Sequence, residues 1–162
     1  MSGDTQPVHK LLEDSADARA EAVAIVHGEQ SWSYAQVEAE ANRTAALLIE
    51  QGVVRGDRVA LLAENGIEYV TGLFGILKAG GCTVALSGAN HARTNRDLLR
   101  DCGAVGLVTR AVAVRKDLPD GIANACQAGH IHNDDVRWLT TGGHDVLLQC
   151  SGLLWIPTQQ GE

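Results

Sequence analysis

The chain has 162 residues, of which 45% are hydrophobic and 20% charged, as expected for one soluble domain or for part of a larger one. The formal net charge is -7 and the sequence contains no basic patch, which argues against nucleic acid as a partner. It has no run of about 18 apolar residues and no basic start followed by an apolar run. We therefore expect no membrane span, no secretory signal and a cytoplasmic location.

The first third of the chain predicts a helix followed by a hairpin. Residues 1–7 are polar and are expected to be a flexible N-terminus. Apolar residues at helical spacing predict a helix over 8–20. A short apolar run at 22–27, the turn Gly28-Glu29 and an extended pattern at 31–33 predict a β-hairpin.

A second helix is predicted to begin at Ser33. The Ser33 hydroxyl and Gln36, three residues later, have the spacing of a capping box. Gly52 is predicted to end this helix, because glycine adopts positive φ at the lowest cost. The turn at 55–57 then leads into a compact apolar strand over 58–63.

The next elements alternate between helix and strand. The helix predicted at 67–79 is apolar nearly all round, which indicates burial on more than one side. A strand follows at 82–86, then a helix over 94–102 that ends at Gly103, and then a strand over 104–109. This order predicts an α/β fold with a mostly parallel sheet and crossover helices.

The sequence suggests an α/β unit over residues 8–110 and a less regular extension over 111–162, with one further strand at 146–149. His130 and His132, with the two following aspartates, have metal-ligand residue types, but a solvated polar loop is favoured and we assign no metal site. His91 precedes a predicted helix, which favours a capping or loop role.

The cysteines are far apart and form no C-x-x-C pair, so we expect no disulfide framework. They are expected to be free thiols in buried, apolar surroundings. The four are Cys82, Cys102, Cys126 and Cys150.

Four stretches combine turns and apolar elements in a recognisable order: Trp32–Val37, Val53–Ala60, Leu77–Leu86 and Asp101–Thr109. Together they resemble motifs of the adenylate-forming enzymes, the family of acyl-CoA synthetases, luciferases and peptide-synthetase adenylation domains. The resemblance covers about residues 8–110, is closer to acyl-CoA ligases than to luciferases, and implies an incomplete N-terminal subdomain of that family. We assign its motif residues structural roles: Tyr34, Gly56, Asp57, Lys78 and Gly80.

Residues 149–158 resemble the Ser-Gly-Thr-Thr-Gly-x-Pro-Lys phosphate loop of the same family. Three positions match: Ser151, Gly152 and Pro157. The remaining positions carry other residues: Leu153 and Leu154 for threonine, Trp155 for glycine, and Thr158 for lysine. Bulky residues hinder a backbone from wrapping phosphates, and a missing lysine removes a charge beside a polyanion. We interpret this segment as a degraded phosphate loop.

The resemblance implies a reaction that joins a carboxylic acid to ATP, with Mg²⁺, and then transfers the acyl group to the thiol of coenzyme A or of a carrier protein. In the family, most catalytic groups lie beyond the segment matched by this chain. We therefore assign no catalytic residue, and Ser151, Gly152 and Pro157 are the candidate contacts to ATP or AMP.

Three hypotheses remain open for the function. The first is a truncated, acyl-CoA synthetase-like N-terminal fragment that is inactive alone. The second is half of a split ligase, completed in trans by a partner carrying the C-terminal half. The third is a non-catalytic α/β interaction or dimerisation module. A homo-oligomer and a complementing C-terminal half are the two protein partners considered. A fragment or half-enzyme should expose the apolar surface that its missing part covers.

Overall fold

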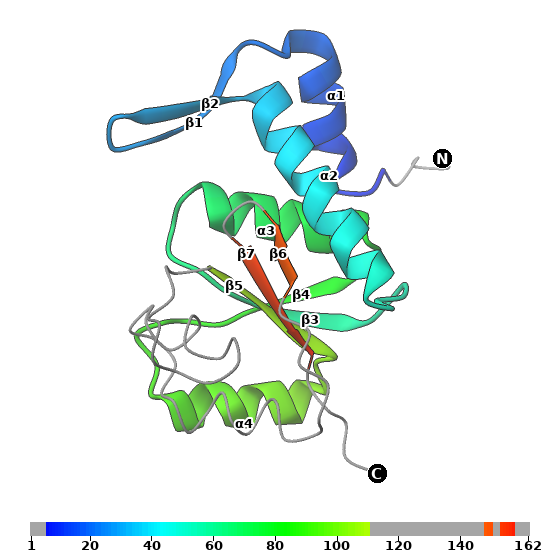
Figure 1. The fold of residues 1–162 in the computed structure, drawn as a ribbon, viewed down its shortest axis with the longest axis vertical. Coiled ribbons are helices and arrows are strands. Elements are labelled where there is room, and N and C mark those ends of the chain that lie inside the picture. The colour runs from blue at the N-terminus through cyan, green and yellow to red at the C-terminus, as the bar shows by residue number, and fades with distance from the viewer. Residues whose placement is uncertain (1–5, 111–147, 151–152, 158–162) are drawn as a thin grey trace, which may run out of the picture.

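The computed structural model describes residues 6–110, 148–150 and 153–157 (Figure 1). A small antiparallel hairpin joins β1 (Val23–His27) to β2 (Gln30–Ser33). The larger sheet has the strand order β4 (Cys82–Ala85), β3 (Arg58–Leu62), β5 (Gly106–Arg110), β7 (Leu153–Pro157) and β6 (Leu148–Cys150). β4, β3 and β5 are parallel, and β7 and β6 add an antiparallel hairpin to the edge of β5.

Four helices accompany these strands: α1 (Lys10–Arg19), α2 (Tyr34–Glu50), α3 (Ile67–Lys78) and α4 (Ala92–Cys102). α3 and α4 lie on opposite faces of the five-stranded sheet, and α2 packs on α3 (Figure 1). α1 and the β1–β2 hairpin lie beside the first half of α2, away from that sheet (Figure 1). No helix in the described part of the chain has the length and apolar character needed to cross a bilayer.

The capping box of α2 is confirmed. The Gln36 amide donates to the Ser33 hydroxyl at 3.3 Å, and the Ser33 amide donates to the Gln36 side chain at 2.8 Å. These two bonds satisfy backbone donors that the first helical turn leaves unpaired. At the other end, Gly52 has φ of 86°, as predicted for the residue that ends this helix.

The turn before β3 is tied to the end of α3. The Val54 amide donates to the Asp57 carboxylate at 2.8 Å, and the Gly56 amide donates to the Gly80 carbonyl at 2.9 Å. The Cys82 amide then donates to the Asp57 carbonyl at 2.7 Å. These bonds align the amino ends of β3 and β4, which gives the glycine and aspartate motif residues the structural role that the sequence predicted.

α3 is buried on two sides, as its sequence predicted. No residue of α3 is exposed, because α2 covers one side and the sheet covers the other. Gly75 lies at the closest approach of α2 and α3: a Cβ atom there would stand 2.5 Å from the Thr44 Cβ and 3.2 Å from the Ala41 carbonyl. Ile76, on the neighbouring position, is fully buried in the main core with Leu48 and Leu61.

Several details differ from the sequence prediction. α1 is Lys10–Arg19 where 8–20 was predicted, and β5 is Gly106–Arg110 where 104–109 was predicted. α4 begins at Ala92, two residues before the predicted start, and residues 153–157 form a strand that the sequence analysis did not predict. The prediction that the cysteines are buried is wrong for Cys82, which is a free, exposed thiol. Its strand, β4, is the edge of the sheet and has a neighbour on one side, so none of its residues is buried.

We predict that Gly75→Ala lowers the free energy of unfolding by about 1–3 kcal/mol, because the added methyl group overlaps Thr44 and overpacks the contact. Chemical denaturation of the full chain measures this loss. A double variant, Gly75→Ala with Thr44→Gly, moves the small residue to the opposite helix and should recover part of it. Steric overlap is not the cause if the double variant loses as much free energy of unfolding as Gly75→Ala alone, or as much as the two single variants together.

We predict that Ser33→Ala lowers the free energy of unfolding by about 1 kcal/mol, because one capping hydrogen bond of α2 is lost. The matched control is Ser31→Ala on the exposed strand β2, which should change stability by less than about 0.5 kcal/mol. Thermal and denaturant unfolding of both variants check this difference. Similar losses in the two variants would show that the cap does not stabilise the helix.

Candidate functional site

The carboxyl edge of the parallel strands is the place where this topology favours a ligand. From β3 the chain passes to its neighbour β4, and it then crosses back to β5 on the other side of β3. The connecting helices α3 and α4 accordingly lie on opposite faces (Figure 1). In open α/β sheets, ligands bind beyond the carboxyl ends of strands where the strand order reverses in this way.

Several polar residues meet at this edge. The chain leaves β3 through the exposed residues Glu64 and Asn65 and enters α3 at Gly66. The end of β1 reaches the same place: a Cβ on Gly66 would stand 3.4 Å from the Nδ1 of His27 and 3.4 Å from the carboxylate of Glu68. The hairpin therefore overhangs the beginning of α3, at the carboxyl edge of the sheet.

The β6–β7 hairpin brings the phosphate-loop-like segment to this edge. Cys150 pairs with Leu153, and Leu153 pairs with Arg110 at the carboxyl end of β5. In the chain, Ser151 and Gly152 join Cys150 to Leu153, and both lie outside the described residues.

Pro157, the third predicted contact, lies at the other end of β7. It pairs with Gly106 at the amino end of β5, roughly 13 Å along the strand from Leu153. The structure therefore separates Pro157 from the edge that Cys150 and Leu153 occupy. A role for Ser151 and Gly152 in binding a phosphate stays a prediction.

The backbone of β7 does not fit a phosphate-binding loop. At Leu153, Leu154 and Trp155, where the family pattern has Thr-Thr-Gly, the strand is paired with β5 on one side and with β6 on the other. A strand between two neighbours uses its N–H and C=O groups in the sheet. Those groups are then not available to surround a triphosphate.

The loop between β4 and α4 is ordered by side-chain amides. Asn95 is buried, donates to the Ser87 carbonyl at 3.0 Å and accepts from the Asn90 side chain at 3.0 Å. His91 occupies the N-cap position of α4, where its carbonyl accepts from the Thr94 amide at 2.9 Å and its side chain makes no capping bond. These contacts give the loop a structural explanation, and His91 has the loop role that the sequence favoured.

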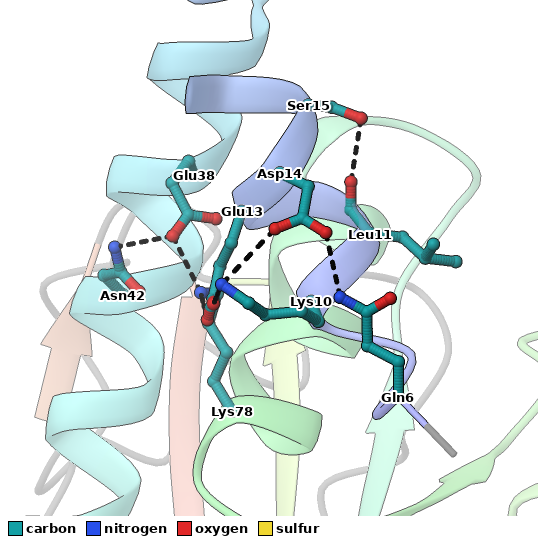
Figure 2. Close-up of polar contacts among 9 residues, drawn as sticks. All are labelled: Gln6, Lys10, Leu11, Glu13, Asp14, Ser15, Glu38, Asn42 and Lys78. Atoms are coloured by element: carbon teal, nitrogen blue, oxygen red, sulfur yellow. Dashed lines mark hydrogen bonds and ion pairs between the residues drawn. The ribbon is translucent and has the colours of Figure 1, made fainter. Parts of the chain in front are cut away.

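Lys78 forms a buried ion-pair cluster with residues from two other helices (Figure 2). Its Nζ lies 2.8 Å from the Glu13 carboxylate on α1 and 2.7 Å from the Glu38 carboxylate on α2. The Lys78 side chain is only 7% exposed. We call Lys78, Glu13 and Glu38 the three-helix cluster.

The three-helix cluster has a structural role. Lys78 is the last residue of α3, which begins at the carboxyl edge of the sheet and ends toward the amino end of β4. The lysine is therefore at the far end of α3 from the candidate site. Its two carboxylate partners neutralise its charge, which is the arrangement that a buried lysine requires.

No group of three or more His, Cys, Asp or Glu residues that could hold a metal ion occurs within residues 6–110, 148–150 and 153–157. The histidines and aspartates at positions 130–135, which have metal-ligand residue types, lie outside those ranges.

The fold is the N-terminal α/β subdomain of an adenylate-forming enzyme. A family model described as "AMP-binding enzyme" matches residues 12–146, well over half of the chain. The chain therefore belongs to the AMP-binding enzyme family, as the four ordered motifs predicted.

Curated relatives include both peptide synthetases and a coenzyme A ligase. The chain is 34% identical over 129 residues to bacitracin synthase 3 of Bacillus licheniformis, covering 80% of this chain and 2% of that protein. It is 45% identical over 74 residues to a medium/long-chain-fatty-acid–CoA and 3-oxocholest-4-en-26-oate–CoA ligase of Mycobacterium marinum, covering 46% of this chain and 14% of that ligase. The chain thus spans a small part of the relatives it matches.

Solved structures of adenylate-forming enzymes share this fold over part of their length. A Mycobacterium tuberculosis fatty acyl CoA synthetase superposes with a TM-score of 0.58 at 31% identity, over 60% of this chain and 20% of that one. The N-terminal subdomain of Klebsiella oxytoca NpsA superposes with a TM-score of 0.59 at 20% identity, over 62% of this chain and 26% of that one, and this likeness concerns the fold alone.

Two features were missed by sequence reasoning: the strand β7 beside β5, and the three-helix cluster at the far end of α3. β7 had a usable signal, because its apolar run Leu153–Ile156 has the length and composition of a strand. The three-helix cluster had none, because Lys78 is 65 residues from Glu13 and 40 from Glu38.

We predict that Lys78→Met lowers the free energy of unfolding by about 3 kcal/mol, because it leaves the Glu38 carboxylate, 17% exposed, without its cation. The matched control is Lys10→Met, which removes a lysine that pairs with Glu13 at the surface and should change stability little. Denaturant unfolding near pH 7 compares the two. Equal effects would show that burial of the pair does not matter.

Proposed function

We propose that this chain supplies the N-terminal α/β subdomain of an AMP-forming fatty-acyl-CoA synthetase and does not adenylate an acid by itself. The observation that carries the second part is the pairing of β7. Residues 153–155 are paired on both sides in the sheet, at the positions where the family pattern has its phosphate loop. The lysine of that pattern is replaced by Thr158.

The chemistry of adenylate formation explains why the residues at 153–155 and 158 matter. Adenylate formation places a carboxylate in line with the α-phosphate of ATP and needs preorganised donors around the phosphates. A glycine-rich loop supplies such donors through a backbone that makes no other hydrogen bonds. A strand paired on both edges supplies none, so Ser151 and Gly152 would have to act without the residues that follow them.

The choice of acyl-CoA synthetase over peptide synthetase rests on sequence likeness. The 45% identity to the Mycobacterium marinum ligase exceeds the 34% identity to bacitracin synthase 3, although it extends over fewer residues. A fatty acid and the thiol of coenzyme A are the substrates that follow from this choice. Carrier-protein pantetheine is the thiol that follows from the alternative.

We predict that the isolated 162-residue chain gives no ATP–pyrophosphate exchange above background with fatty acids or amino acids. Mass spectrometry or radiolabel exchange with purified protein measures this. A variant that restores the pattern, with Leu153→Thr, Leu154→Thr, Trp155→Gly and Thr158→Lys, should also stay inactive, because the chain covers only 20% of the synthetase it resembles. Robust exchange by either protein would overturn the proposal.

A domain exchange tests the acyl-CoA assignment separately. Residues 8–110 of this chain would replace the equivalent segment of the Mycobacterium tuberculosis synthetase and, in parallel, that of a bacitracin synthase 3 adenylation domain. The proposal requires the synthetase hybrid to keep fatty-acyl-CoA formation within about tenfold of the parent, which corresponds to about 1.4 kcal/mol of activation free energy. Activity in the peptide-synthetase hybrid alone would assign the chain to the other branch.

A further inference from the structure

Helix α1 is attached to the rest of the fold by little apolar contact. Leu12 is the one buried residue of Lys10–Arg19. It packs on Val37 and Ala41 of α2 in a small cluster separate from the main core. Val8, just before this helix, and Leu11, in its first turn, are 59% and 61% exposed. One buried leucine is a small apolar attachment for a whole helix.

Polar and charged groups supply the other attachments of α1. At its end, the Ala35 amide donates to the Ala20 carbonyl at 3.0 Å, and Arg19 donates to the Tyr34 hydroxyl at 3.2 Å and lies over the Tyr34 ring. Glu13 of α1 meets Lys78 of α3 at 2.8 Å, and its second carboxylate oxygen meets Lys10 at 3.1 Å (Figure 2). Lys10 also lies 3.3 Å from Asp14, on the exposed side of α1. Of these contacts, Glu13 to Lys78 is the ion pair that joins α1 to another element.

The arrangement of the three-helix cluster allows α1 to move away without leaving Lys78 as an unpaired buried charge. When Glu13 departs, Lys78 keeps its 2.7 Å ion pair with Glu38, which also accepts from the Asn42 side chain at 3.0 Å. The other oxygen of Glu38, Oε2, is buried and has no hydrogen-bond partner among the described residues.

We propose that α1 undocks as a unit from α2 and α3 while the sheet stays folded, and that the ion pair of Glu13 with Lys78 sets this equilibrium. Undocking uncovers Val37 and Ala41, and with them the partly buried side chains Trp32 and Phe74 of the same cluster. The domain thereby has a second state that presents an apolar surface beside the hairpin.

Titration of Glu13 provides a way to move this equilibrium. The hydrogen bonds from Lys78 and then from Lys10 lower the pKa of the Glu13 carboxyl from its ordinary value. A lowered pKa means that Glu13 stabilises the docked state above the pH where an unfolded glutamate titrates, and that this contribution is lost as the pH falls through the folded value. Acid, below about pH 4.3, therefore favours the undocked state.

Hydrogen exchange on the full chain, followed by mass spectrometry at pH 7, tests the proposal. Glu13→Gln should speed exchange of the α1 amides by tenfold or more and leave α3 and β3 unchanged. The matched control is Asp14→Asn, which alters the exposed partner of Lys10 and should change exchange in α1 by less than twofold. Unchanged protection of α1 in Glu13→Gln, or faster exchange of α1, α3 and β3 together, would overturn it.

A second variant acts on the apolar attachment. Leu12→Ala removes the buried side chain of α1 and should speed exchange in that helix alone, as Glu13→Gln does. Both variants should also bind an apolar dye at pH 7 that the unchanged chain binds only in acid. Dye binding that is the same in all three proteins across this pH range would contradict a local undocking.

Discussion

The close contact between α2 and α3 is the constraint on which the rest of this structure depends. Gly75 allows the backbone of α3 to reach Thr44 of α2, so that both helices share one core with the sheet. α3 in turn links β3 to β4, and its last residue carries the cation that binds Glu13 and Glu38. α3 therefore contacts two other parts of the fold. It packs on the sheet through apolar side chains, and it binds α1 through the ion pair of Lys78 with Glu13.

Much of the fold could be predicted because the interactions that determine it join residues close together in the sequence. The capping box at Ser33 and Gln36 and the terminating Gly52 depend on neighbours a few residues away. The nearly all-apolar stretch of α3 identified a helix covered on both sides. The buried strand β3 followed in the same way, because its apolar run is bounded by a turn.

The rest depends on partners that are distant in sequence. Nothing next to Lys78 indicates that two carboxylates from other helices meet it, and nothing in the flanks of β4 indicates that it is an edge strand exposing Cys82. The candidate site was predictable only in part. The match of Ser151, Gly152 and Pro157 to the phosphate-loop pattern stays a prediction, and the pairing of β7 with β5 is a tertiary contact that the motif does not indicate.

Residues 153–157, which resemble part of the family's phosphate loop, form a strand beside β5. The interactions among α2, α3, β3 and β4 involve the turn at Asp57, the core around Ile76 and the three-helix cluster. The β6–β7 hairpin joins this unit through β5, and β6 also approaches α2. That hairpin attaches to the outer edge of β5, where apolar side chains and backbone pairing suit a strand. Leu153, Leu154 and Trp155 favour pairing over a free loop, because bulky apolar residues gain from a sheet and glycine does not. Under the predicted match to the phosphate loop, the residues that depart from the family pattern are therefore the ones that give this segment its strand propensity.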